Sequence, residues 1–440
     1  MVDPLPAGPA GTAAGGTGVP SSRAGAPRRW PVPPTALLWA LAALAWLASA
    51  AYMWHFGPLW HLDLRVYRAA GRALLHHGSP FRALFTTRRL PFTYPPFALL
   101  VLTPLSFGPL GLVEGAWWLL SALALVSTLY LLIPADLPGR VLPRGRRLAL
   151  ASLLAGAATL AIEPVRSNMD YGQINLLLMW LVVVDLHQRR PGLRGVFIGL
   201  AAAVKLTPLV YLLYYAVRRD WRSVGQGAAT FSVLSLASWL VLPGDSTLYW
   251  LHEATDAART GPVGFVSNQS WNGMLHRAPF AGHGGDTALW VVLCVAVVVL
   301  GGVACERLSA DRRPLVEPVL VLALVELLVS PISWSHHWSW MAAAPIAAWT
   351  LWRDHRSAAV AVVAVLAVSV ASPYLWGVQR GVGAFVADNS LVLAGAAVLV
   401  VTAASLLAGR RRPTVGTVRR DRVNPTAGRR PPGRPEGGER

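Results

Sequence analysis

The stretch ALLWALAALAWLASAAYMW, residues 36–54, decides the fold class of this chain. It carries no charged side chain, and at a rise of about 1.5 Å per residue it is long enough to cross the hydrocarbon core of a bilayer. It lacks a small-residue cleavage site, so we interpret it as a retained helix rather than a signal peptide. Similar apolar runs recur along nearly the whole chain, which predicts an all-α, polytopic transmembrane bundle.

The composition agrees with this prediction. Of the 440 residues, 54% are hydrophobic and 14% are charged, whereas a soluble domain contains about 25% charged residues. The net charge of +18 does not indicate a nucleic-acid partner, because the cations sit in short loops and tails beside the apolar runs. We expect disordered cytoplasmic tails at 1–36 and 409–440, the second of them basic, on either side of a transmembrane domain at 37–408.

The candidate spans run near 37–54, 97–133, 148–164, 174–187, 196–217, 224–243, 288–305, 315–330, 336–352, 357–377 and 390–408. Segment 97–133 contains SFGPLG and is long enough for two helices. Segment 196–217 is interrupted by KLTP at 205–208, which favours two half-helices around a cavity. We therefore expect about 11–13 spans, and the topology of 109–147 and of 196–217 stays open.

Basic loops predict the cytoplasmic side, and the remaining polar motifs then gather on the opposite side. The basic loops are Arg140–Arg147, Arg189–Arg194, Arg218–Arg222, Arg307–Arg313 and Arg353–Arg356. The motifs on the other side are DLRVYRAAG (63–71), RSNMDYGQIN (166–175), SNQSWNG (267–273) and SPISWSHHW (330–338). We expect the functional site on this extracytoplasmic side.

One acid stands among cations after the first span. Residues 61–81, HLDLRVYRAAGRALLHHGSPF, contain Asp63 followed by Arg65, Arg68 and Arg72. The pattern predicts a short amphipathic helix, near 63–77, that lies in the membrane interface with its apolar side down. Two interpretations remain: Asp63 is a functional acid beside anion-binding arginines, or it caps the helix while the arginines reach lipid phosphates.

Lys205 lies inside an otherwise apolar run. A charged side chain at that depth costs about 2.5–3.5 kcal/mol on insertion scales, so it tends to mark a functional cavity. The alternative is a lysine that reaches back to the interface. The broken-helix signal of the neighbouring Thr207–Pro208 favours a site.

His336 and His337 stand at the head of a predicted helix, beside Trp334. They are suited to acid–base chemistry or to phosphate binding, and the Trp ring to stacking on a sugar. The alternative is an aromatic belt with interfacial histidines. The two histidines are adjacent and no HxxxH or HExxH spacing occurs, so the sequence supports no metal site.

Uncharged hydrogen-bonding side chains complete the candidates. They lie near the ends of predicted helices and suit a hydroxyl-rich ligand: Gln173, Asn175, Asn268 and Ser270. For each of them the alternative is that the side chain only caps a loop. The sequence contains no GxGxxG, no P-loop and no DxD, and Asp63 is followed by Leu64 and Arg65. Arginine and lysine are then the groups available to neutralise a phosphate.

Six motifs in this order resemble the family-87 glycosyltransferases of the GT-C superfamily, which are polyprenyl-phosphate-dependent mannosyltransferases of actinobacteria. The resemblance covers roughly residues 37–405. Its motifs are DLRVYRAAG and GSPF (63–81), LPFTYPPFALLVLTPL (90–105), GQINLLLMWLVVVDL (172–186), GLAAAVKLTPLVYLLY (199–214), NQSWNG (268–273) and SPISWSHHW (330–338).

This resemblance implies a multi-pass GT-C enzyme of the plasma membrane whose active site is extracytoplasmic. The donor would be polyprenyl-phosphate mannose, and the acceptor a mannose-bearing lipid or glycan, such as a phosphatidylinositol mannoside or lipomannan, extended by an α-1,2 linkage. The family requires no cofactor and no metal. Asp63 matches the acid that serves the family as catalytic base.

Together, the residues and the resemblance give an expected site. Inverting sugar transfer needs one base for the acceptor hydroxyl, and the departing phosphate needs cations. Asp63 would be the base. The donor phosphate would be held by Lys205, Arg65, Arg68, Arg166, His336 and His337. Sugars would be contacted by Tyr94, Gln173, Asn175, Asn268, Ser270 and Trp334.

Three alternatives stay open at this stage. The motifs do not separate mannose from arabinose, so a polyprenyl-phosphate arabinofuranosyltransferase is the nearest alternative. A transporter or flippase of a lipid-linked sugar would also show broken helices and a buried lysine. Its usual two-fold internal repeat is not visible in the sequence, and the long loops at 55–95 and 244–287 favour an enzyme. A non-catalytic scaffold fits the one-sided polar motifs least.

Overall fold

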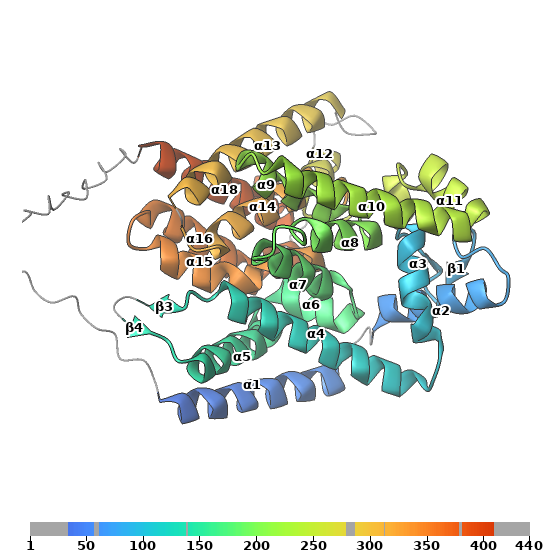
Figure 1. The fold of residues 1–440 in the computed structure, drawn as a ribbon, viewed down its shortest axis with the longest axis horizontal. Coiled ribbons are helices and arrows are strands. Elements are labelled where there is room, and N and C mark those ends of the chain that lie inside the picture. The colour runs from blue at the N-terminus through green and yellow to red at the C-terminus, as the bar shows by residue number, and fades with distance from the viewer. Residues whose placement is uncertain are drawn as a thin grey trace, which may run out of the picture.

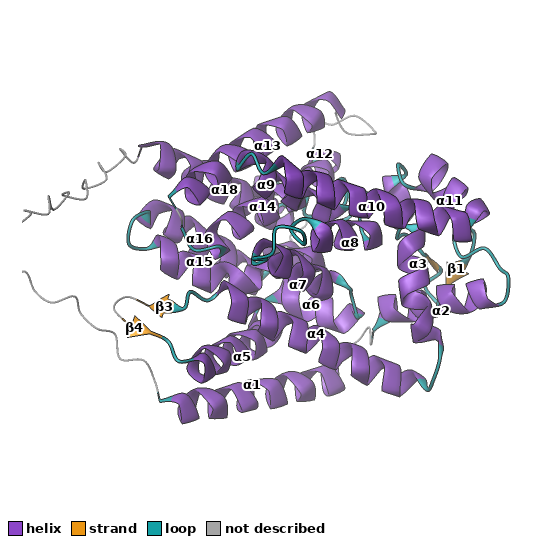
Figure 2. Ribbon diagram, viewed as in Figure 1, coloured by secondary structure: helices purple, strands orange, loops and turns teal. Residues whose placement is uncertain are grey.

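The computed structural model describes residues 34–56, 61–137, 140–278, 287–311, 313–377 and 381–408. This part of the chain is almost entirely helical (Figures 1 and 2), which confirms the predicted all-α, polytopic bundle. Two short antiparallel hairpins are its strands. The two predicted tails lie outside the described residues, apart from 34–36, where the first helix begins.

The elements follow one another as α1 (Thr35–Phe56), α2 (Leu62–Leu75), β1 (Leu84–Phe85), β2 (Leu90–Pro91), α3 (Pro96–Leu102), η1 (Thr103–Ser106), α4 (Leu110–Leu132), β3 (Asp136–Leu137), β4 (Arg140–Val141), α5 (Arg144–Ala161), α6 (Glu163–Tyr171), α7 (Asn175–Leu186), α8 (Val196–Val204), η2 (Thr207–Tyr211), α9 (Leu212–Val217), α10 (Trp221–Val241), α11 (Pro243–Leu248), η3 (Tyr249–Glu253), η4 (Ala257–Thr260), α12 (Trp271–Arg277), α13 (Thr287–Ala310), α14 (Val316–Val329), η5 (Ser335–Ala343), α15 (Ala344–Leu351), α16 (Arg356–Ala371), η6 (Pro373–Leu375), α17 (Val382–Asp388) and α18 (Ser390–Ala408). Here η3 is a π-helical turn and the other η elements are 3-10 helices.

Six helices of the described residues are long and apolar enough to cross a membrane, and the bent pair α5 and α6 raises the number to seven. This is fewer than the 11–13 spans that we expected. The difference arises because several apolar segments form short or broken helices: α7 has 12 residues and α14 has 14. The expected division of 97–133 into two helices and the expected break in 196–217 are both present.

Helices α1 and α5 run side by side along one edge of the bundle (Figure 1). A Cβ on Gly156 would lie 3.0 Å from Ala45 Cβ, so the glycine permits this close approach. The Trp46 indole donates to Ser152 Oγ at 3.2 Å. Small residues and interhelical hydrogen bonds are the usual means by which helices associate in lipid, where apolar burial gives little driving force.

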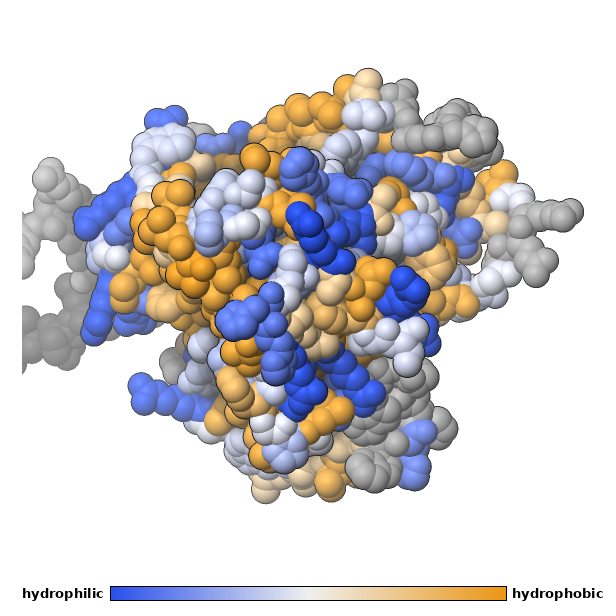
Figure 3. Space-filling model, turned by 90° about the vertical axis from the view of Figure 1, so that its right-hand side faces the viewer, coloured by the Kyte–Doolittle hydropathy of each residue, from blue (hydrophilic) through white to orange (hydrophobic). Residues whose placement is uncertain are grey.

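Besides the main apolar core of the bundle, a smaller one lies at the end that carries α2, the β1–β2 hairpin and α3. Helix α2 covers the segment predicted as an amphipathic helix, although it ends at Leu75, two residues earlier than expected; its place in the membrane interface stays a prediction. Its buried face includes Leu64 and Tyr67 and packs on η1 and α3. Figure 3 views the molecule from this end, where hydrophilic side chains gather in patches between apolar ones.

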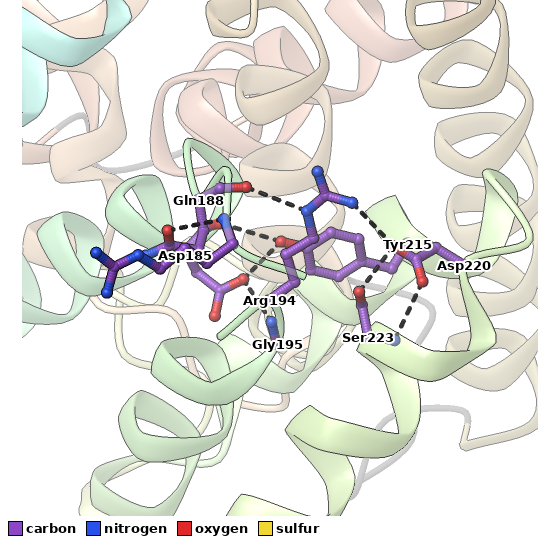
Figure 4. Close-up of polar contacts among 8 residues, drawn as sticks. Asp185, Gln188, Arg194, Gly195, Tyr215, Asp220 and Ser223 are labelled. Atoms are coloured by element: carbon purple, nitrogen blue, oxygen red, sulfur yellow. Dashed lines mark hydrogen bonds and ion pairs between the residues drawn. The ribbon is translucent and has the colours of Figure 1, made fainter. Parts of the chain in front are cut away.

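The buried Asp185 fixes the start of α8 (Figure 4). Its carboxylate accepts hydrogen bonds from the backbone amides of Gly195 at 2.7 Å and Phe197 at 2.8 Å, and from the Tyr215 hydroxyl at 2.6 Å. An acid at the N-terminus of a helix accepts hydrogen bonds from backbone amides that have no partner within the helix, and its negative charge complements the helix dipole. Because α8 ends at Val204, its anchored start determines where Lys205 lies.

Candidate active site

Asp63 lies in the first turn of α2, but it does not occupy the capping position. The N-cap is His61, which has a left-handed backbone (φ 50°) and donates its N–H to the Asp170 carbonyl at 2.7 Å. The half-buried Asp63 carboxylate instead accepts a hydrogen bond from Gln173 Nε2. The interpretation of Asp63 as a helix cap is therefore wrong.

Two tyrosines fix the orientation of the buried Gln173 amide. The Tyr94 hydroxyl donates to Gln173 Oε1 at 2.9 Å, and the Tyr67 hydroxyl lies 3.2 Å from the same oxygen and 2.9 Å from Tyr94 Oη. Because Oε1 faces these donors, the amide nitrogen points toward Asp63. The Gln173 amide thereby holds Oδ2 of the Asp63 carboxylate in place.

The turn after α6 brings Gln173 to α2. Gly172 follows the last residue of α6 with φ 64° and ψ 39°, a conformation that glycine adopts without strain. A Cβ at this position would lie 2.9 Å from Leu64 Cβ and 3.0 Å from His61 Cδ2. The YGQIN turn therefore packs directly against the start of α2, which is why Gln173 meets Asp63.

Lys205 stands at the break between α8 and η2, with an extended backbone (φ −152°, ψ 129°). Its Nζ donates to Asn175 Oδ1 at 2.8 Å and lies 3.0 Å from His337 Nε2. It also lies 5.6 Å from the centroid of the Tyr94 ring. The interrupted helix thus carries its cation to the same cluster as the Gln173 network.

The two histidines occupy different surroundings at the start of η5. His337 is half-buried and faces Lys205, whereas His336 is buried. The His336 ring lies 5.3 Å from the Tyr171 ring, and its Nε2 has no hydrogen-bond partner among the described residues. Asn168 and Asn175 donate to its backbone carbonyl, which fixes the loop to α6 and α7.

The surroundings of Asp63 suit a general base. Desolvation raises the pKa of its carboxyl group to about 7, although the hydrogen bond from Gln173 and the charge of Lys205 both act to lower it. A base whose pKa is close to the working pH accepts a proton effectively, and about half of its molecules are ionised at that pH. The cluster therefore combines one carboxylate with one cation, held by residues from five separate segments.

Three of the predicted phosphate-binding arginines have other partners. Arg65 Nε forms an ion pair with Glu114 at 2.9 Å. Arg68 is buried and donates to the carbonyl oxygens of residues 105, 107 and 108, at 2.6, 3.2 and 2.6 Å. Arg166 donates to the Leu160 carbonyl at 2.9 Å. The structure brings Lys205 and the two histidines together, but not these arginines.

Two of the predicted sugar-binding residues brace a loop instead. Asn268 is fully buried, and its Oδ1 accepts from the Ser333 amide at 2.8 Å and from Ser270 Oγ at 3.0 Å. Ser270 also caps α12 by accepting from the Gly273 amide. Trp334 pairs with Asn268 through the backbone and remains half-buried at the start of η5.

Three functional or supporting residues were missed in the sequence. Tyr67 lies four residues after Asp63, so helical spacing alone would have placed both on one face. Glu163 begins α6 and accepts from Tyr374 Oη and from Ser335 Oγ, which ties α6 to the histidine loop. Glu326 accepts from Tyr211 Oη at 2.8 Å. An acid within an apolar segment is the signal that would have found both glutamates.

Within the described residues, no group of three or more His, Cys, Asp or Glu side chains is arranged to hold a metal ion. Residues 92–331, more than half of the chain, match the family model of glycosyltransferase family 87. The chain belongs to glycosyltransferase family 87. It is therefore a glycosyltransferase, and with its apolar helices a multi-pass membrane protein.

Relatives of this family-87 glycosyltransferase include two mycobacterial enzymes of one name, polyprenol-phosphate-mannose-dependent alpha-(1-2)-phosphatidylinositol mannoside mannosyltransferase. The Mycobacterium tuberculosis protein is 36% identical over 345 residues, covering 76% of this chain and 80% of the relative. The Mycolicibacterium smegmatis protein is 39% identical over 302 residues, covering 64% and 68%. An alpha-(1->3)-arabinofuranosyltransferase of Corynebacterium glutamicum is 26% identical over 261 residues, covering 56% and 60%.

Proposed function

We propose that this family-87 enzyme transfers mannose from a polyprenyl-phosphate donor to a hydroxyl of a mannose-bearing lipid or glycan, with an α-1,2 linkage. The names of the more similar relatives support this donor, and they support a phosphatidylinositol mannoside as the acceptor class. We place the active site on the extracytoplasmic side of the plasma membrane, where the loop charges of the sequence predict it.

The observation that carries the proposal is that Asp63 and Lys205 belong to one polar cluster. The Asp63 carboxylate removes the proton of the acceptor hydroxyl as that oxygen forms its bond to the anomeric carbon. The bond between the anomeric carbon and the phosphate oxygen breaks on the opposite face, and its electron pair leaves with the polyprenyl phosphate. Attack from the face opposite the leaving group inverts the anomeric configuration.

Lys205 and His337 stabilise the charge that develops on the departing phosphate. A lysine ammonium has three donors; Asn175 and His337 face two of them, which leaves one for a phosphate oxygen. The unpartnered Nε2 of His336 is a further candidate donor in the same region. We leave Arg65, Arg68 and Arg166 out of this phosphate site, because each has a partner elsewhere.

The sugar contacts are revised in the same way. Asn175 is half-buried in the cluster, and Trp334 is half-buried just before the start of η5. We therefore retain both as sugar contacts. Gln173 and Tyr94 act on Asp63 through the hydrogen bonds described above. Asn268 and Ser270 shape the loop and are not proposed to touch sugar.

The test is sugar transfer by purified wild-type protein in detergent, with synthetic polyprenyl-phosphate mannose and a mannoside acceptor, in the presence and absence of EDTA. Asp63→Asn is assayed beside wild type, and Asp245→Asn, which alters another half-buried acid, is the matched control. We expect product that resists EDTA, is retained in the control and is lost in Asp63→Asn. Full activity of a folded Asp63→Asn variant would remove Asp63 as the base.

A second candidate function follows from the arabinofuranosyltransferase relative, which is less similar and covers less of the chain. The same assay includes polyprenyl-phosphate arabinose as a second donor. Product with arabinose alone would replace the proposed donor and retain the proposed mechanism. Absence of product with either donor would overturn the proposed donor class, and movement of a lipid-linked sugar across vesicles would then be measured.

A further inference from the structure

The segment between α1 and α3 contains more arginines than the proposed active site uses. Arg65 and Arg68 are paired with Glu114 and with backbone carbonyls. The remaining four side chains, Arg72, Arg82, Arg88 and Arg89, are exposed. Cations are unfavourable in a short extracytoplasmic loop, so a concentration of them there points to an anionic ligand.

Two of these arginines sit side by side at the tip of the β1–β2 hairpin. The strands pair at Leu84 with Pro91 and at Phe85 with Leu90, and the four residues between them read TTRR. Thr86 and Arg89 both have positive φ, 62° and 54°, so the tip is a tight turn. Arg88 and Arg89 are exposed beyond it.

The base of the hairpin is held firmly. Phe81 and Phe92 are buried, and their rings pack at 5.6 Å. The Arg259 guanidinium donates to the Phe81 and Phe92 carbonyls and forms an ion pair with Glu253 at 2.7 Å. These contacts fix the position from which the two exposed guanidinium groups project.

The hairpin lies next to the catalytic cluster. Strand β2 leads within three residues to Tyr94, and the Phe92 and Tyr94 rings are 5.8 Å apart. The charge of Arg88 acts to lower the pKa of the Tyr171 phenol, which burial raises. The Tyr171 ring packs on His336, and the hairpin that carries Arg88 leads to Tyr94, so both belong to the surroundings of the cluster.

We propose that Arg88 and Arg89 bind the phosphodiester of a lipid-anchored acceptor. This inference rests on the proposed function, in which two phosphate-bearing lipids meet at one enzyme. The donor phosphate is bonded directly to the reacting carbon and belongs beside Lys205. The acceptor's phosphate is separated from its reacting hydroxyl by at least one ring, so it needs a second cationic site farther out.

The chemistry of arginine fits this role. A guanidinium group matches two phosphate oxygens with two parallel hydrogen bonds, whereas an ammonium acts as a point charge. Two adjacent guanidinium groups on a fixed turn can orient a phosphodiester as well as attract it. This orientation selects acceptors that carry a phosphate anchor over neutral glycans.

The test compares two acceptors, a phosphatidylinositol mannoside and a phosphate-free alkyl mannoside, in neutral phosphatidylcholine vesicles. The double variant Arg88→Gln/Arg89→Gln is assayed beside wild type. The matched control is Arg222→Gln, which removes one exposed charge at the start of α10. We expect KM for the phosphate-bearing acceptor to rise roughly tenfold or more in the double variant, and KM for the alkyl mannoside to stay unchanged. Arg88→Lys/Arg89→Lys should recover part of the loss.

A second set of vesicles contains added phosphatidylglycerol and distinguishes the source of the phosphate. A defect that appears only in these anionic vesicles would make bulk lipid headgroups the ligand and overturn the proposal. An equal loss with both acceptors, or no loss with either, would overturn it as well. Failure of wild type with both acceptors, the phosphatidylinositol mannoside included, would count against the proposed function itself, and is thereby distinguished from failure of the hairpin site.

Discussion

The Tyr94 hydroxyl donates to Gln173 Oε1 at 2.9 Å, and this contact helps to determine which end of the amide faces Asp63. A flipped amide would place Oε1 against the carboxylate and its NH₂ group against two hydroxyl groups. The tyrosine thus acts on the proposed base through an intermediate side chain. Tyr67 supports the same orientation from the helix that carries Asp63.

We expect Tyr94→Phe to shift the pH profile of kcat/KM to higher pH and to lower kcat/KM at pH 7 by up to about tenfold. The hydrogen bond from Gln173 favours the ionised carboxylate, so a less firmly held amide leaves the pKa of Asp63 higher. Tyr249→Phe, at a buried tyrosine in the same apolar core, is the control. A sugar-binding role for Tyr94 would raise KM and leave the profile in place.

We expect kcat/KM of the wild-type enzyme to increase with pH and to level off above about 7. Burial raises the pKa of Asp63 from 3.8 to about 7, and only its ionised form accepts the acceptor's proton. The measurement is a pH series at substrate concentrations well below KM. A profile that is flat from pH 6 to pH 8 would contradict this assignment.

The same shift predicts a pH dependence of stability. Because the pKa of Asp63 is higher in the folded than in the unfolded protein, the folded state binds more protons between pH 3.8 and about 7. The free energy of unfolding therefore falls as pH rises through this window. Thermal unfolding in detergent should show this trend in wild type and a weaker one in Asp63→Asn. Identical slopes for the two proteins would speak against a raised pKa of Asp63.

We expect Lys205→Met to lower kcat by roughly 10²–10³-fold, because a preorganised cation no longer meets the charge on the departing phosphate. Lys205→Arg should retain part of the activity. Arg194→Met, which breaks a distant ion pair with Asp220, is the control for loss of one positive charge. An unchanged kcat with a raised KM would show that Lys205 contributes to binding alone.

We expect Arg68→Met to lower the free energy of unfolding by at least about 2 kcal/mol, because three carbonyl oxygens lose a buried donor. Arg65→Gln should cost no more than about 1 kcal/mol, as its ion pair is partly exposed. Thermal unfolding of the two variants in detergent checks this ranking. Near-wild-type stability of Arg68→Met, combined with a raised KM for the donor, would return Arg68 to the phosphate site.

The helical bundle could be predicted because long apolar runs leave the backbone few alternatives in lipid. The break at Lys205 was equally readable, since a charged residue beside Thr-Pro interrupts an apolar helix. The number of spans could not be predicted in this way. Helices α7 and α14 are shorter than a bilayer is thick, and their apolar composition does not reveal where they end. Apolar residues line both a lipid-facing helix and one buried in protein.

The sequence indicated which motifs meet, but not how individual side chains are used. Arg68 and Arg88 carry the same charge in the same segment, and only the structure shows that the first is buried against carbonyls and the second exposed. Asn268 has the same difficulty, because an amide that braces a loop and one that binds sugar look alike in a sequence. Partners from distant segments decide between these roles.

Helix α6 is bent by 84° from α5, and its polar residues have their partners far along the chain. Glu163 accepts hydrogen bonds from Ser335 and Tyr374, which lie 172 and 211 residues downstream. So polar a helix does not enter lipid alone. These contacts can form only after the C-terminal half has been synthesised, so we expect the proposed active site to be among the last parts of the protein to assemble. Truncated chains should reach the membrane and remain inactive.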